Sequence, residues 1–234
     1  MPGFLESALF ERLIDHAPLF PPAQLPLPEA LEEHRQAREG RHGWIVRRFV
    51  APATVVDSLD GEPPALSVVL DADVDVDDPR IEAVEVPPGG PVPSFGGEVY
   101  VEGALPPLAA PGTRVKVRCG PAVPLIAELA EAVRACRRYG VPFKATAGLH
   151  HAVRQDGQHG FLNLLAAAVF GDEEAALAED DAGAFGVDDD VFRWRDRTAS
   201  PAEVERGRAL FVAFGSCSFS EPVDDLISLG FLSG

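Results

Sequence analysis

The chain has 234 residues, of which 46% are hydrophobic and 24% are charged, a composition that excludes collagen-like, disordered and disulfide-scaffold proteins. Its net charge of −17 repels phosphate backbones and anionic lipid headgroups, so we expect neither a nucleic-acid nor a membrane partner. Three cysteines are too few for a disulfide framework, and the acidic Glu6 and Glu11 do not suit a signal peptide. We therefore expect a cytoplasmic protein.

The pattern along the chain alternates between helix-like and strand-like segments. Apolar residues recur at helical spacing over residues 4–16, and a polar helix follows over 28–40, which predicts an N-terminal helical segment over 1–40. Further helices are predicted at 124–140, 161–170 and 172–185, and 191–196 is expected to be a strand or half of a hairpin. Strands are predicted at 44–50, 66–71, 81–86, 98–102, 114–119, 142–146 and 210–216.

This alternation predicts an α/β fold with a parallel sheet. Seven or eight strands over 1–234 fit a single (β/α)₈ domain of the TIM-barrel type, and an irregular α/β sheet is the alternative. The connections 87–97 and 103–113 are rich in proline and glycine, which disfavours a helix in either. We therefore expect a barrel that lacks one or two of its helices.

Lysine usage singles out two positions. Of the twenty basic residues eighteen are arginine, and the two lysines, Lys116 and Lys144, both lie in short apolar runs. Strand alternation places Lys116 on one face with Arg114 and Arg118, and Lys144 on one face with Thr146. In a barrel this polar face points into the lumen, where charges need a partner or a ligand. In an antiparallel sheet, the alternative, it would be a solvated face.

The segment FKATAGLHH (143–151) is the densest motif, because a mid-strand lysine leads directly into a loop with two histidines. Barrel enzymes carry their chemistry at these strand ends. We expect Lys144, its pKa lowered by burial and by the cation Lys116, to attack a carbonyl group and form a Schiff base, with Glu102 or His150 carrying protons. The residues expected to hold the substrate anion are Arg118, Thr146, His151, Ser216 and Ser218, the serines because they precede a predicted helix start.

Two resemblances accompany these motifs. FKATAG (143–148) and VKVRCG (115–120) resemble adjacent strands of deoxyribose-phosphate aldolase and related class I aldolases, which implies a lyase with Lys144 as the imine-forming residue. Those aldolases have another lysine on a later strand, whereas residues 210–218 have none, so Lys116 would supply the second positive charge. Over its whole length the chain is similar to a family of hypothetical bacterial proteins, which implies no function, through the blocks LFPP, KVRCG, FKATAGLHH, HGFLNLL and FGSCSF.

The predicted function is a barrel enzyme, lyase-like or aldolase-like, that acts on a small anionic carbonyl compound without a cofactor. One alternative is a reaction without a Schiff base, in which the two lysines stabilise an enolate. A variant of it places a metal on His150, His151 and His159 with Asp15 or His16, although no metal-binding spacing supports this and we predict no metal site. The other alternative is a non-catalytic binding protein. A homo-oligomer is left open.

Overall fold

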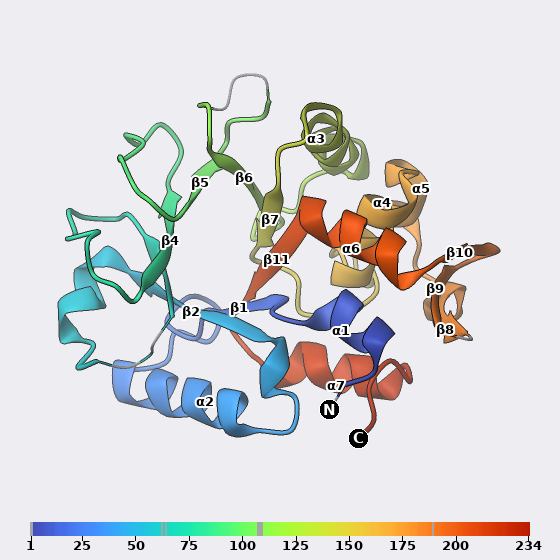
Figure 1. Ribbon diagram of the computed structural model, residues 1–234, viewed down its shortest axis with the longest axis horizontal. Coiled ribbons are helices and arrows are strands. Elements are labelled where there is room, and N and C mark those ends of the chain that lie inside the picture. The colour runs from blue at the N-terminus through green and yellow to red at the C-terminus, as the bar shows by residue number, and fades with distance from the viewer. Residues whose placement is uncertain (1, 62, 64, 107–109, 189) are drawn as a thin grey trace.

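The computed structural model describes residues 2–61, 63, 65–106, 110–188 and 190–234. Eight parallel strands close into a barrel (Figure 1), in which β1 and β11 complete the circle. In order around the barrel they are β1 (Ile14–His16), β2 (Val46–Pro52), β3 (Leu66–Val69), β4 (Ile81–Val86), β5 (Glu98–Glu102), β6 (Arg114–Arg118), β7 (Phe143–Thr146) and β11 (Phe211–Ser216). The parallel closed barrel confirms the predicted fold class, and the irregular and antiparallel sheets are ruled out.

Helices cover only part of the barrel (Figure 1). They are α1 (Phe4–Phe10), α2 (Leu27–Glu39), α3 (Ile126–Tyr139), α4 (Phe161–Phe170), α5 (Glu173–Ala178), α6 (Pro201–Leu210) and α7 (Ser220–Ser228), with short 3₁₀ turns at η1 (Gly43–Ile45), η2 (Ala53–Ser58) and η3 (Ala182–Ala184). A separate antiparallel sheet lies outside the barrel and consists of β8 (Phe185–Asp188), β9 (Val191–Trp194) and β10 (Arg197–Ala199). None of the described helices is long and apolar enough to cross a membrane.

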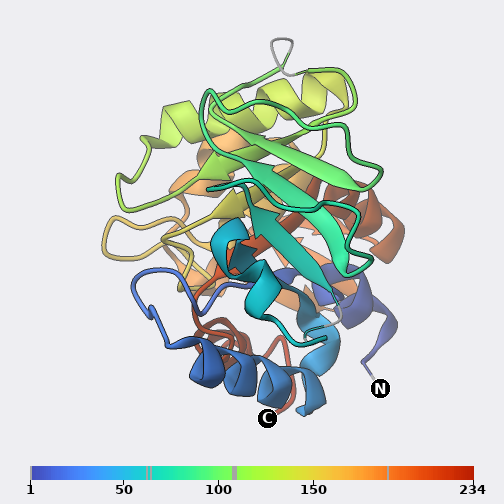
Figure 2. The same cartoon turned by 90° about the vertical axis from the view of Figure 1, so that its left-hand side faces the viewer.

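The side of the barrel formed by β3, β4 and β5 is covered by loops (Figure 2). The connection 87–97 contains no helix, as expected, and neither does the connection 70–80. The other connection that was expected to lack a helix, 103–113, includes residues that lie outside the described ranges. The outward valines Val84 and Val99 are nevertheless buried, because partly buried loop residues such as Val74 and Phe95 pack over them. Loop side chains here take the place of a helix in covering the apolar face of the sheet.

The expectation of a helix over residues 4–16 is wrong in its second half. The helix α1 ends at Phe10, Arg12 takes a positive φ of 50°, and residues 14–16 form the strand β1 between β2 and β11. All three residues of β1 are buried, although two of them, Asp15 and His16, are polar. A strand of three residues is too short to show the alternation that distinguishes a strand from the end of a helix. The N-terminal segment 1–40 is therefore not entirely helical, and it contributes the first barrel strand.

A second difference concerns residues 172–185, where a single helix was expected. The helix α5 ends at Ala178, and Phe185 already begins β8. The expected strand or half-hairpin at 191–196 is confirmed as β9, which pairs with both β8 and β10. This small sheet contributes Phe192 and Trp194 to the apolar core that α4 and α6 share with the barrel.

Candidate active site

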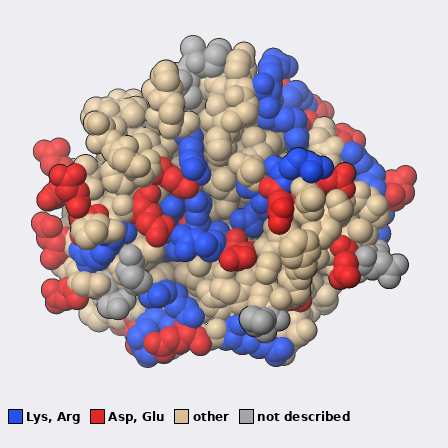
Figure 3. Space-filling model, viewed as in Figure 1, with Lys and Arg blue, Asp and Glu red and all other residues tan. Residues whose placement is uncertain are grey.

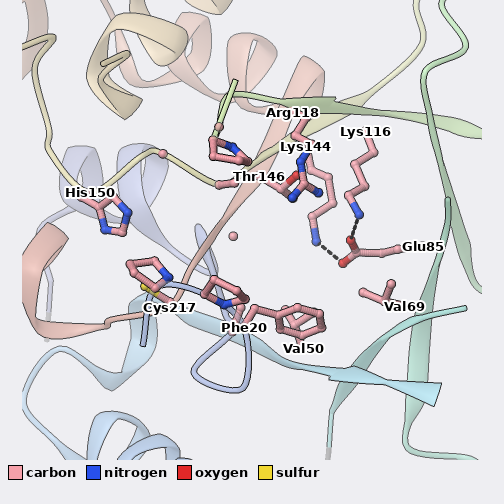
Figure 4. Close-up of a pocket in the computed structure, with 18 of the residues that line it drawn as sticks. Phe20, Val50, Val69, Glu85, Lys116, Arg118, Lys144, Thr146, His150 and Cys217 are labelled. Atoms are coloured by element: carbon pink, nitrogen blue, oxygen red, sulfur yellow. Dashed lines mark hydrogen bonds and ion pairs between the residues drawn. The ribbon is translucent and has the colours of Figure 1, made fainter. Parts of the chain in front are cut away.

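A cavity of about 530 Å³ opens at the carboxyl-terminal ends of the barrel strands. Its walls come from most of the strands, including Val50 of β2, Glu85 of β4, Lys116 of β6, Lys144 of β7 and Gly215 of β11. Figure 4 shows the labelled side chains converging on this space. Because each strand of a parallel barrel ends at the same rim, residues far apart in the sequence meet here, as in other barrels of this type.

Lys144 lies at the inner end of the cavity and is completely buried. Its Nζ atom donates hydrogen bonds to Asp15 Oδ2 at 2.5 Å and to Glu85 Oε1 at 2.6 Å. It also lies 5.3 Å from the centre of the Tyr100 ring, a cation–π distance. The inward orientation predicted for Lys144 from strand alternation is confirmed, and its ammonium group is surrounded by two carboxylates and an aromatic ring.

Lys116 faces the same space from the neighbouring strand, at the same level, because Lys116 and Lys144 are register partners between β6 and β7. Its Nζ atom lies 3.0 Å from Glu85 Oε2 and 3.1 Å from Glu102 Oε2. Both lysines therefore bind the same carboxylate (Figure 4), which brings their ammonium groups within about 8 Å of each other. This confirms the geometric expectation that the two lysines share one pocket.

These contacts form a continuous series of alternating charges that runs from the mouth of the cavity to its inner end. At the mouth, Arg118 has a half-exposed side chain (51%) and lies 3.8 Å from Glu102. Each further member contacts the next, in the order Arg118, Glu102, Lys116, Glu85, Lys144, Asp15. Three bases and three acids balance, and this pairing offsets the cost of removing so many charges from water.

The electrostatics of Lys144 differ from the expectation. Burial alone would lower the pKa of Lys144, but the attraction of Asp15 and Glu85 outweighs it and raises the pKa above its ordinary value. For Glu85, burial would raise the pKa, but Lys144 and Lys116 outweigh it and hold the pKa well below its usual range. The predicted lowering of the Lys144 pKa is therefore wrong, because its nearest neighbours are anions and the charge of Lys116 is itself balanced by Glu85 and Glu102.

Below Lys144, a second polar layer fills the barrel toward the amino-terminal ends of the strands. Tyr100 donates a hydrogen bond from its hydroxyl to Glu98 Oε2 at 2.8 Å, and Arg47 and Arg48 both bind Glu98. Burial would raise the pKa of Glu98, but the two arginines outweigh it and lower the pKa to about 2. Figure 3 shows basic and acidic side chains interspersed at the centre of the face that it views.

Glycine at position 148 allows the loop after β7 to pack against the end of β6. Its φ is +68°, and a Cβ atom there would lie 2.8 Å from the carbonyl oxygen of Cys119. Gly120 approaches the same backbone from the other side, where a Cβ atom would come within 3.2 Å of Gly148. This close approach brings the start of the loop, up to His150, to the mouth of the cavity.

The two histidines of this loop have different surroundings. His150 lines the cavity, and its Nδ1 atom lies 3.0 Å from Glu221 Oε2 of α7. His151 is not among the residues that line the cavity, and its Nδ1 atom lies 3.3 Å from Asp225 Oδ2, so it holds the loop against α7. Its expected contact with a substrate is therefore not supported by its position.

The histidine arrangement also bears on the metal alternative. The Nε2 atom of His159 lies 2.9 Å from the Pro124 carbonyl oxygen, whereas His150 and His151 contact Glu221 and Asp225. Within the described ranges, no group of three or more histidine, cysteine, aspartate or glutamate side chains is arranged to hold a metal ion. The geometry gives the metal-dependent alternative no support.

The turn that contains Ser216 and Ser218 lies at the predicted end of the barrel, because Gly215 and Cys217 line the cavity together with Gly148. The serine hydroxyls, however, serve the turn itself. Ser216 Oγ donates to the Ser218 carbonyl at 2.6 Å, and Ser218 Oγ accepts a hydrogen bond from the Glu221 backbone N–H at the start of α7. Neither serine lines the cavity, and their hydroxyls bond within the turn and to the start of α7, so their positions give the expected role in holding an anion no support.

Of the remaining residues that were expected in the site, two line the cavity and one does not. Arg118 and Thr146 line the cavity, and the Thr146 hydroxyl is buried without a hydrogen-bond partner among the described residues, so their role in substrate binding stays a prediction. Glu102 binds Lys116 and does not line the cavity. The carboxylates that contact Lys144 are instead Asp15 and Glu85, and neither was assigned a catalytic role from the sequence.

No family model matches the chain, and no curated protein or solved structure matches it either. The aldolase resemblance therefore remains a prediction that rests on the motif around Lys144.

Proposed function

We propose that this protein is an enzyme of the lyase type that acts on a small anionic carbonyl compound through an imine on Lys144. The observation that carries the proposal is a buried amine at the inner end of a strand-end cavity, bonded to two carboxylates at 2.5 and 2.6 Å. An amine in such a position has both the nucleophile and the proton acceptors that imine formation requires. The resemblance of FKATAG to class I aldolases supports the same assignment.

In the proposed reaction, the Lys144 ammonium first transfers a proton to Asp15 or Glu85. The nitrogen lone pair then attacks the carbonyl carbon, and a proton passes from the nitrogen to the carbonyl oxygen to give a carbinolamine. The protonated carboxylic acid returns its proton to the carbinolamine hydroxyl, which leaves as water and gives a protonated imine. The imine accepts the electron pair of an adjacent carbon–carbon bond as that bond breaks, giving an enamine, while the departing fragment gives the proton of its own hydroxyl group to the carboxylate and leaves as a carbonyl compound. Protonation of the enamine carbon and hydrolysis of the imine release the second product and restore the Lys144 amine. Asp15 is suited to the proton transfers, because its Oδ1 atom is buried and has no hydrogen-bond partner in the described part of the chain.

The raised pKa of Lys144 sets the order of these steps. The resting amine is protonated, so attack on a carbonyl waits for the proton to move to a carboxylate. Lys116 is itself bound by two carboxylates, and its role in the proposal is to stabilise negative charge that develops on the substrate, rather than to lower the pKa of Lys144.

The same pKa favours a second candidate, a reaction without a covalent intermediate. A lysine that stays protonated at neutral pH can stabilise an enolate as a cation, and Lys144 and Lys116 would then act as a pair. The substrate class and the cavity are the same in this candidate.

Borohydride reduction tests these candidates. We expect incubation with small keto acids or aldehydes, followed by borohydride and peptide mass spectrometry, to give a secondary-amine adduct on Lys144 and not on Lys116. Turnover without any adduct would identify the enolate reaction, and binding without turnover would identify a non-catalytic binding protein.

A further inference from the structure

We infer that the substrate carries a branched or aromatic apolar group next to its carbonyl and acid groups, and that it is not a phosphorylated sugar. This inference rests on the proposed function, since it names the substrate class for the same cavity. It rests on the difference between the two walls of the cavity, one apolar and one basic. It also rests on the hydrogen bonds that the serine hydroxyls at the mouth of the cavity already make.

One wall of the cavity is apolar. Phe20 and the prolines after it come from the loop that follows β1, Val50 from β2 and Val69 from β3. Figure 4 shows Phe20, Val50 and Val69 together on one side of the space. A sugar, which carries a hydroxyl on nearly every carbon, would lose hydrogen bonds to water against this wall and gain none.

The opposite wall carries the basic groups, and the carboxylate of Glu85 from β4, which also lines the cavity, is bound by both lysines. Lys116, Arg118, Lys144 and Thr146 all belong to β6 and β7, and Figure 4 shows them facing the apolar side chains across the cavity. Arg118 is the basic group best placed for a substrate acid, because it is half-exposed and its contact with Glu102 is long, at 3.8 Å. A ligand that satisfies both walls is amphipathic, with its carbonyl and acid on the β6–β7 side and its apolar group on the β1–β3 side.

The mouth of the cavity is poorly suited to a phosphate. The hydroxyl of Ser216 donates to the Ser218 carbonyl, and the hydroxyl of Ser218 accepts from the backbone N–H of Glu221 at the start of α7. The first turn of α7 carries the acidic Glu221, whose carboxylate lies beside His150 at this rim. A phosphate dianion here would meet a carboxylate of like charge.

The size of the cavity agrees with this assignment. Its volume of about 530 Å³ lies within the range of pockets for larger organic ligands, and a three-carbon keto acid would leave much of it unfilled. Filling the apolar side with a four-carbon branched group removes both apolar surfaces from water, which is a favourable contribution that pyruvate cannot make.

Calorimetric titration of the protein with three probes tests the inference. The probes are 4-methyl-2-oxopentanoate, which has the apolar branch, pyruvate, which has only the carbonyl and acid, and glyceraldehyde 3-phosphate. We expect 4-methyl-2-oxopentanoate to bind at least about tenfold more tightly than pyruvate, and glyceraldehyde 3-phosphate to bind more weakly than either. Val69→Thr, which keeps the shape and adds a hydroxyl, should reduce this preference severalfold. The matched control is Val92→Thr on an exposed loop position, which should leave it unchanged.

The outcomes separate this inference from the proposed function. Tighter binding of glyceraldehyde 3-phosphate, or a preference that Val69→Thr does not alter, would overturn the apolar assignment even if Lys144 forms a borohydride-reducible imine. Binding of 4-methyl-2-oxopentanoate with the expected preference but without a reducible adduct would uphold the apolar assignment and contradict the imine. Failure of all three probes to bind would overturn both.

Discussion

Lys116 and Lys144 each bind one oxygen of the same carboxylate, that of Glu85, at 3.0 and 2.6 Å. Glu85 is almost completely buried and also accepts a hydrogen bond from Ser67 Oγ at 2.7 Å. It therefore links the two cations of the cavity and fixes their relative position.

This relationship makes Glu85 the first residue to test for stability. Glu85→Gln keeps the shape but leaves two buried ammonium groups with one carboxylate fewer, so we expect the free energy of unfolding to fall by about 3–5 kcal/mol. Urea denaturation measures this. Glu131→Gln is the control, because the ion pair between Glu131 and Arg134 lies on the surface. Removing this ion pair should change the free energy of unfolding by no more than the experimental error. An equally small effect of Glu85→Gln would show that the lysines do not depend on this carboxylate.

A second prediction concerns proton transfer. Asp15→Asn keeps a hydrogen-bond acceptor for Lys144 but removes a carboxylate that accepts its proton. Glu85 still holds the amine in place. We expect the rate of imine formation, followed by borohydride trapping at timed intervals, to fall about 10²- to 10⁴-fold. An unchanged rate would assign the proton transfers to Glu85 alone.

A third prediction concerns pH. His34 of α2 is buried against His16, with the two Nδ1 atoms 3.2 Å apart, and burial, followed by the charges of His16 and Arg38, lowers the pKa of His34 to about 3. The unfolded chain takes up this proton near pH 6.5, while the folded chain does so only near pH 3. The unfolded chain therefore binds more protons than the folded chain between pH 6.5 and pH 3, and the free energy of unfolding falls as the pH is lowered through this range. The loss at pH 5 is about 2 kcal/mol. Denaturation of wild type and His34→Gln at pH 7 and pH 5 measures it, and the variant should lose less stability over this interval. Equal losses in both proteins would contradict the assignment.

A fourth prediction concerns the loop after β7. Gly148→Ala combines a positive φ with a Cβ atom 2.8 Å from the Cys119 carbonyl oxygen. Gly61→Ala is the matched control, because Gly61 has a similar φ of +83° and no atom within 4 Å of the added Cβ. We expect Gly148→Ala to be destabilised by about 1–3 kcal/mol more than the control in thermal or urea denaturation. Equal effects would mean that the backbone there moves apart without cost.

Much of the barrel could be predicted because its strands carry a local signal. The strands β4 and β5 have the expected bounds, and β6 and β7 differ from theirs by a single residue at one end. In β5, β6 and β7 valine, phenylalanine or alanine alternates with polar side chains, and β4 is a short run rich in β-branched residues. The strand β1 could not be separated from the preceding helix, because three buried residues carry too little periodicity.

The partners of Lys144 could not be predicted for a different reason. Asp15 is 129 residues away in the sequence and Glu85 is 59 residues away, so only closure of the barrel brings them together. The sign of the Lys144 pKa shift depends on these contacts, which is why the inward face of the strand was predicted correctly and the pKa was not. The hydrogen bonds of Ser218 could not be predicted for a similar reason, because a hydroxyl before a helix start can bind an anion or the backbone of the helix itself.

The proposed function depends on a covalent bond between the amine of Lys144 and the substrate carbonyl carbon. The most direct measurement is mass spectrometry of the protein after borohydride reduction in the presence of 4-methyl-2-oxopentanoate and related carbonyl acids. It should be made on wild type, Lys144→Arg and Lys116→Arg, since arginine keeps the charge but cannot form the imine. We predict one adduct on Lys144 in wild type, none in Lys144→Arg, and an adduct with measurable turnover in Lys116→Arg. A fully active Lys144→Arg protein, or an adduct confined to Lys116, would contradict this prediction.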